Sequence, residues 1–190
     1  MENELALASF MLLATLSPGP NNFIVMRASA AGGKRAALVC VLGVLLGSIL
    51  LLFTAQFGLG LVLKRLPAAQ LLLTWLGSGM LVWMGLGMIW NGGQKKDGAA
   101  PALASSTIGV ALFQLLNPKS WLMAVTILSI SGGLSWHLVL LFLAVMLVSL
   151  SLWTIAGALL MAALRKQGPR IWFDRAMGLS LIGCAALLLG

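Results

Sequence analysis

Long apolar runs separated by short polar breaks dominate the sequence. Each run has about 20 residues, which is the length that an α-helix needs to cross the hydrocarbon core of a bilayer. The breaks contain glycine, proline and paired basic residues, which are typical of turns between helices. The pattern predicts six membrane-spanning helices, at residues 5–26, 38–63, 68–90, 107–129, 138–164 and 171–190. The longest polar stretch, residues 91–106, separates the third helix from the fourth.

The composition points to the same class of protein. Of the 190 residues, 61% are hydrophobic and 8% are charged, whereas about 25% of a typical soluble domain is charged. A water-soluble globule of this size could not bury so much apolar surface. We therefore expect an all-α, polytopic membrane protein with a single transmembrane domain, residues 1–190, in contact with membrane lipid.

Basic residues are distributed unevenly among the predicted loops. The first, third and fifth loops hold nine of them, and the second and fourth loops hold only Lys64 and Arg65. Loops rich in Lys and Arg stay in the cytosol, so the odd-numbered loops, including 91–106, are predicted to be cytosolic and both termini to lie outside. The net charge of +8 occurs in short pairs rather than beside aromatic residues, which argues against a nucleic-acid partner.

The rarest residues indicate that the chain consists of two related halves. Pro18 and Pro118 are 100 positions apart, and Lys64-Arg65 matches Arg165-Lys166 at an offset of 101. We interpret residues 1–95 and 105–190 as repeats of three helices each, with chance matching in a Leu-rich chain as the alternative. An odd number of helices per repeat inverts the second repeat in the membrane. Transporters often have this architecture, with the substrate site where the repeats meet.

Prolines interrupt the first and fourth predicted helices at equivalent positions. The breaks are Ser17-Pro18-Gly19-Pro20-Asn21-Asn22 and Asn117-Pro118-Lys119. In each, an expected N-cap residue, Ser17 or Asn117, precedes a proline, which is favoured at the first helical position. Each break would present the positive end of a half-helix inside the membrane, where it suits an anionic group such as a substrate carboxylate. A plain proline kink is the alternative interpretation.

Lys119 is predicted near the middle of the fourth helix, where a charge costs at least about 2.5–3.5 kcal/mol. The four acidic residues are all predicted at helix ends or in loops, so a substrate carboxylate is the expected counter-ion. The predicted substrate-binding residues are Asn21, Asn22, Asn117 and Lys119, followed by Gln56 and Gln114, which could also simply join helices. With one histidine and no acid predicted in the membrane, we expect neither an enzyme nor a bound metal or cofactor.

These features together resemble the LysE/RhtB family of bacterial amino-acid exporters over essentially the whole chain. The matching motifs are Ser17-Pro18-Gly19-Pro20-Asn21, Gly33-Lys34-Arg35 followed by Gly43-x-x-x-Gly47, Gln114-Leu115-Leu116-Asn117-Pro118-Lys119, and Gly178 with Gly183. Ala37 departs from the family, which often has glycine there. The resemblance implies export of amino acids or close derivatives across the bacterial inner membrane, often by a homodimer.

The sequence therefore predicts an inner-membrane exporter of small zwitterionic amino acids. Export of basic amino acids is one alternative. Export of inorganic cations is another, although cation sites need carboxylates. The alternative from a different class is a non-transporting membrane scaffold, which would have no reason to bury Lys119.

Overall fold

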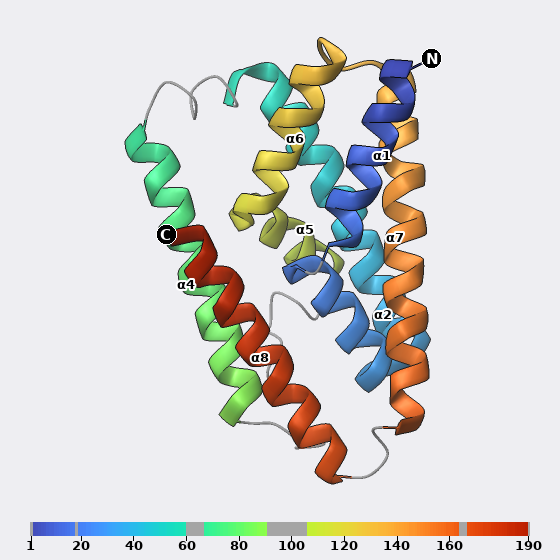
Figure 1. Ribbon diagram of the computed structural model, residues 1–190, viewed down its shortest axis with the longest axis vertical. Helices are drawn as coiled ribbons and strands as arrows, with labels where there is room; N and C mark the ends of the chain where they lie inside the picture. The colour runs from blue at the N-terminus through green and yellow to red at the C-terminus, as the bar shows by residue number, and fades with distance from the viewer. Residues whose placement is uncertain (1, 18, 60–66, 91–105, 164–166, 190) are drawn as a thin grey trace.

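The computed structural model describes residues 2–17, 19–59, 67–90, 106–163 and 167–189, and the described chain contains helices and no strands (Figure 1). The elements are α1 (Glu2–Leu16), α2 (Pro20–Thr54), the π-helix η1 (Ala55–Leu59), α4 (Pro67–Trp90), α5 (Thr107–Leu116), α6 (Pro118–Ser131), α7 (Trp136–Ala163) and α8 (Gln167–Leu189). The expected all-α class is therefore correct for the described residues.

Two predicted loops are part of helices instead. The break expected around Gly32 and Arg35 is a single residue, Gly33, whose φ of 69° and ψ of −163° kink α2. This positive φ favours glycine, because a side chain would be strained there. The break expected at 167–169 is the first turn of α8. Pro169 fits there, because the first turn of a helix does not need its missing N–H.

Both expected proline breaks are present, although one is capped differently than predicted. Asn117 is the N-cap of α6, and its side chain accepts a hydrogen bond from the main-chain N–H of Lys119. In the first break the N-cap of α2 is Gly19 rather than Ser17, and Pro20 takes the first helical position. The main-chain N–H of Ser17 bonds to Leu13 O at 3.0 Å, so Ser17 continues the end of α1. Pro18 lies outside the described residues.

The described helices include clear candidates for membrane spans. Gly32–Gly58 and Trp136–Leu160 are each long and apolar enough to cross a bilayer, with mean hydropathies of 2.8 and 2.6. The pair α5 and α6, bent by 72°, is a third candidate if it forms one broken span. The six spans and their inverted repeat therefore stay predictions.

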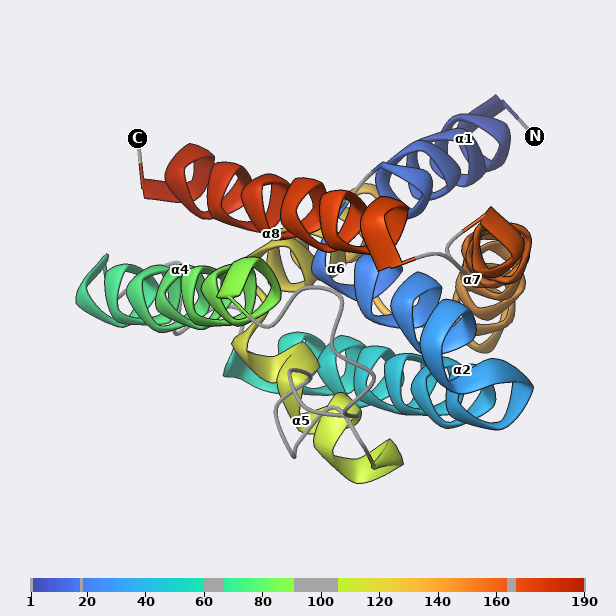
Figure 2. The ribbon, with the colours of Figure 1, turned by 90° about the horizontal axis from the view of Figure 1, so that it is seen from below.

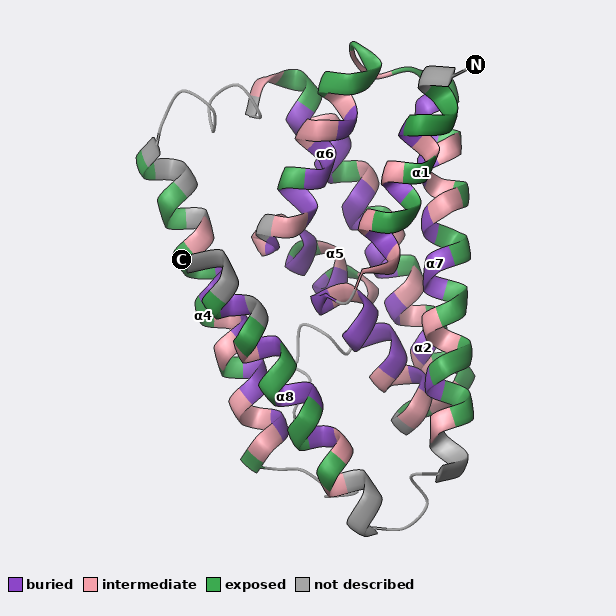
Figure 3. Ribbon diagram, in the orientation of Figure 1, coloured by how far each residue is buried: buried purple, intermediate pink, exposed green. Residues whose placement is uncertain are grey.

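The helices form two groups. Helix α2 packs against α7 and α5, α1 packs against α7, and α4 packs mainly against α8 (Figure 2). Buried residues lie on the facing sides of these helices, and Met11, Val44 and Phe142 are among the most buried (Figure 3). Large apolar side chains such as Leu140 and Leu159 are exposed on the outside. So much exposed apolar surface is the surface of a protein surrounded by lipid.

Glycines allow the closest helix contacts. A Cβ atom at Gly47 of α2 would lie 2.6 Å from the carbonyl oxygen of Ala111 in α5, and one at Gly43 would lie 2.7 Å from that of Thr107. Helices α4 and α8 cross in the same way, because a Cβ at Gly85 would lie 2.6 Å from the Gly178 oxygen. Small residues of this kind let helix backbones approach closely in membranes.

Candidate functional site

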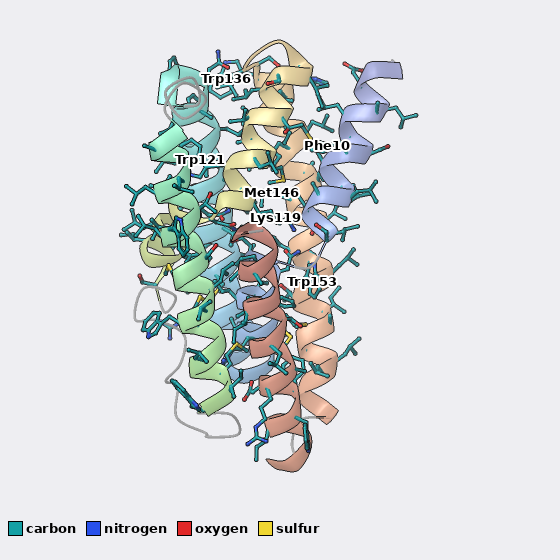
Figure 4. The ribbon with its side chains drawn as sticks, turned by 60° about the vertical axis from the view of Figure 1, so that its left-hand side comes forward. Phe10, Lys119, Trp121, Trp136, Met146 and Trp153 are labelled. Carbon is teal, nitrogen blue, oxygen red and sulfur yellow. The ribbon has the colours of Figure 1, made fainter. Side chains whose placement is uncertain are left out.

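A cavity lies where the two helix breaks meet, and residues of α1, α2, α6 and α7 line it. Its volume of about 20 Å³ is room for about one water molecule. The polar residues that line it are Thr15, Asn21, Asn22, Asn117, Lys119, Ser120 and Ser149. Figure 4 shows Lys119 and Met146, which also lines the cavity, near each other in the middle of the molecule.

Lys119 is held at the end of α1. Its ammonium donates hydrogen bonds to the carbonyl oxygen of Ser17 at 2.8 Å and to the Ser17 hydroxyl oxygen at 2.7 Å. The C-terminal end of a helix carries partial negative charge, which stabilises a cation. A Cβ at Gly19 would lie only 3.0 Å from Lys119 Nζ, so the absence of a side chain at Gly19 makes room for the ammonium.

Side chains tie the two ends of each broken helix together. Asn22 Nδ2 donates to the carbonyl oxygens of Thr15 at 2.7 Å and Ser17 at 3.0 Å. Across the second break, Trp121 Nε1 donates to Leu115 O at 2.8 Å. The last carbonyl groups of a helix have no partner within the helix. These side chains supply partners and hold both breaks in a defined geometry.

A chain of hydrogen bonds connects the two breaks with α2. Asn117 Nδ2 donates to Asn21 Oδ1 at 3.3 Å, and Asn21 Nδ2 donates to Ser120 Oγ at 3.5 Å. Ser120 Oγ in turn donates to Gln114 Oε1 at 3.0 Å. Gln114 Nε2 then donates to Ser48 Oγ at 2.6 Å. The network fixes the orientation of both asparagine amides at the cavity.

Two positively charged groups face the cavity. The N-cap of α2, Gly19, provides no side-chain hydrogen bond, so the partial positive charge of this helix end faces the cavity beside the Lys119 ammonium. Among the described residues that line the cavity, none is Asp or Glu. Asp174 is only 5% exposed, but it lies in α8 and does not line the cavity. This arrangement suits a bound carboxylate.

Comparison with known proteins identifies the family of this chain. The family described as LysE type translocator matches residues 12–190. The chain belongs to the LysE type translocator family. The translocator is 30% identical over 185 residues to a cysteine/O-acetylserine efflux protein of Escherichia coli O139:H28, a match that covers 93% of this chain and 92% of that relative.

A second relative is the leucine efflux protein of Klebsiella pneumoniae subsp. pneumoniae. It is 30% identical over 115 residues, which cover 58% of the translocator and 54% of that protein. No solved structure matches the chain. The resemblance seen in the sequence motifs is thus confirmed at the level of the family, and the translocator is a membrane protein.

The structure brings four of the six predicted binding residues of the translocator to one cavity, namely Asn21, Asn22, Asn117 and Lys119. Gln114 is fully buried behind Ser120 and does not line the cavity. Gln56 is elsewhere: it is exposed in η1, and its Oε1 accepts a hydrogen bond from the main-chain N–H of Leu134 at 3.2 Å. Gln56 therefore joins the end of α2 to the turn after α6.

Three hydroxyl residues of the cavity were absent from the predicted set: Thr15, Ser120 and Ser149. Ser149 Oγ donates to the carbonyl oxygen of Thr15 at 2.9 Å. Ser149 lies 101 positions after Ser48, which contacts the end of α5 through Gln114. Each serine thus holds the broken end of a helix from the other predicted half. The repeat offset was the signal that could have identified Ser149.

Proposed function

We propose that this translocator exports small neutral amino acids, or close derivatives of them, from the cytosol across the bacterial inner membrane. One observation carries the proposal: the Lys119 ammonium and the N-terminus of α2, which has no side-chain cap, face the same cavity. Both favour an anionic group. The α-carboxylate is the anionic group that all amino acids share.

The lining of the cavity favours a substrate without a charged side chain. A lysine-like substrate would bring a second cation close to Lys119, and like charges repel strongly where the dielectric constant is low. The α-ammonium group of a zwitterion can instead use the amide oxygens of the asparagines that line the cavity. The two relatives named above are efflux proteins for leucine and for cysteine and O-acetylserine, which supports this substrate class.

We propose that transport requires the two halves of the chain, residues 1–95 and 105–190, to move relative to each other as inverted repeats. A cavity of about 20 Å³ is too small for an amino acid, so α1, α6 and α7 have to separate before a substrate enters. The meeting of both helix breaks at one cavity supports this mechanism, as does the equivalent use of Ser48 and Ser149. Alternating access around a fixed midplane site is common in inverted-repeat transporters.

The proposed orientation places both chain termini outside. The end of α4, the end of α7 and the start of α8 lie at the lower end of the molecule, and the N-terminus lies at the upper end (Figure 1). In α8, Arg175 lies over the ring of Trp172, 5.8 Å from its centroid. Trp is enriched at both membrane interfaces, and Lys and Arg are enriched on the cytosolic side. The lower end is therefore assigned to the cytosol.

Efflux measurements test the proposal. Cells that express the translocator are loaded with labelled alanine, leucine, cysteine, lysine or arginine, and the rate of release is compared with that of cells expressing the Lys119→Met variant at the same level. We expect faster release of the neutral amino acids only. Preferred release of lysine or arginine would overturn the neutral substrate class. If wild-type cells release no amino acid faster than cells that lack the translocator, a scaffold would be favoured.

A further inference from the structure

The residues that line the cavity divide into a polar and an apolar set. The polar set comes mainly from the two breaks, includes Lys119, and also contains Ser149 of α7. The apolar set contains Met123 of α6 together with Met146 and Leu150 of α7. These three side chains are 8%, 3% and 1% exposed, so they form a buried apolar wall of the cavity.

The apolar set lies one helical turn from the ammonium. Lys119 and Met123 are four positions apart in α6 and therefore share one face, about 6 Å apart along the helix axis. Met146 and Leu150 share a face of α7 in the same way. An amino acid whose carboxylate binds Lys119 can thus extend its side chain along α6 to Met123.

Two hydroxyl groups that line the cavity, those of Thr15 and Ser149, already donate to main-chain carbonyl groups. Ser149 Oγ donates to Thr15 O at 2.9 Å, and Thr15 Oγ1 donates to Leu12 O at 3.1 Å. Both hydroxyl protons are therefore engaged. A polar side chain of a substrate would exchange its water for thioether and aliphatic surface, which costs free energy unless new hydrogen bonds form.

We infer that Met123, Met146 and Leu150 form a side-chain subsite that selects neutral amino acids with an apolar side chain of moderate length, aliphatic or sulfur-containing. The inference rests on the proposed function and specifies the substrate class of the same site. Methionine has three rotatable bonds and a polarizable sulfur. The two methionines fill the small cavity when it is empty and move aside when a substrate side chain enters.

Substrate preference tests the subsite. The Met146→Ala variant is compared with wild type for efflux of labelled alanine, leucine, methionine, phenylalanine and serine. A methylene group in an apolar pocket changes selectivity by about 10-fold or more, so we expect the ratio of phenylalanine to alanine efflux to rise by about 10-fold. Met84→Ala is the matched control, because Met84 is 5% exposed in α4 and does not line the cavity. It should leave the ratio unchanged.

A second variant tests the same subsite. Met123→Ala should shift the ratio of phenylalanine to alanine efflux in the same direction as Met146→Ala, which provides a test if Met146→Ala does not insert. If a well-expressed Met146→Ala or Met123→Ala variant keeps the wild-type ratio of phenylalanine to alanine efflux, the subsite is wrong. It is also wrong if the wild-type protein exports serine in preference to leucine and methionine. Neither result would contradict the proposed function. Absence of efflux of every amino acid by wild type would overturn the proposed function together with the subsite.

Discussion

The ammonium nitrogen of Lys119 lies 2.8 Å from the main-chain carbonyl oxygen of Ser17, although the two residues are 102 positions apart in the chain. The contact joins the first turn of α6 to the end of α1, and so connects the two predicted halves. A cation at the negative end of a helix is stabilised by the helix dipole. Lys119 is therefore already oriented toward the cavity before any substrate carboxylate arrives.

Replacing Lys119 with methionine should abolish export and leave the protein in the membrane. Methionine has nearly the length of lysine but loses both hydrogen bonds to Ser17, and an uncharged residue costs less in the bilayer. Lys119→Arg should restore only part of the activity, because the planar guanidinium is larger than the ammonium and Gly19 leaves little space beside it. The activity of both variants is measured as efflux of labelled leucine, normalised to the amount of protein in the membrane.

Lys34→Met is the matched control for the loss of a lysine charge. Lys34 is exposed beside the kink at Gly33 and does not line the cavity, so this variant should export normally. Wild-type efflux by a well-expressed Lys119→Met variant would remove Lys119 from the mechanism.

Asn22→Ala should destabilise the first helix break. The amide of Asn22 satisfies two main-chain carbonyl groups, and the side chain is only 4% exposed. Each carbonyl group keeps one other donor, Ser149 or Lys119, so each lost hydrogen bond costs about 0.5–1.5 kcal/mol. Thermal unfolding of the purified protein in detergent should show a lower midpoint. Trp121→Phe, which loses a single bond to Leu115, should lower it less, and equal midpoints for both variants and wild type would contradict the role of these ties.

Gly47→Ala should destabilise the contact between α2 and α5. The added methyl group would meet the carbonyl oxygen of Ala111 at 2.6 Å, and overpacking of this kind costs about 1–3 kcal/mol. Gly79→Ala is the control, because a Cβ at Gly79 of α4 would have no other atom within 4 Å. Alanine is a better helix former than glycine, so Gly79→Ala should unfold at the wild-type temperature or slightly above. The reverse order of the two variants would contradict the close contact.

Cysteine labelling distinguishes the proposed orientation of the chain in the membrane from the reverse one. In a variant with Cys40 and Cys184 replaced by alanine, Gln94→Cys should react with a membrane-impermeant thiol reagent only after the cells are permeabilised, because the basic loop around it is predicted to be cytosolic. His137→Cys, at the exposed start of α7, should react in intact cells. Strong labelling of Gln94→Cys in intact cells would reverse the proposed orientation.

The helical class of the described chain and the positions of both breaks follow directly from the sequence. An apolar run of about 20 residues has to be helical in a membrane, because only regular hydrogen bonding satisfies its main chain there. A proline inside such a run interrupts that hydrogen bonding, which locates the breaks at 17–20 and 117–118. The capping of the first break was harder to predict, because Ser17 and Gly19 both precede a proline. In the structure Gly19 has an extended backbone and is the N-cap of α2.

The sequence by itself thus determined the class of protein, the positions of the breaks and the residues of the breaks that face the cavity. Only the tertiary structure separated Gln114, buried behind Ser120, from the exposed Gln56, although both are glutamines predicted within the membrane. It also decided that Met146 and Ser149 border the cavity. These two residues belong to a uniformly apolar helix in which hydropathy has no preferred face. The packing of α7 against α1 and α2 selects the face that meets the breaks.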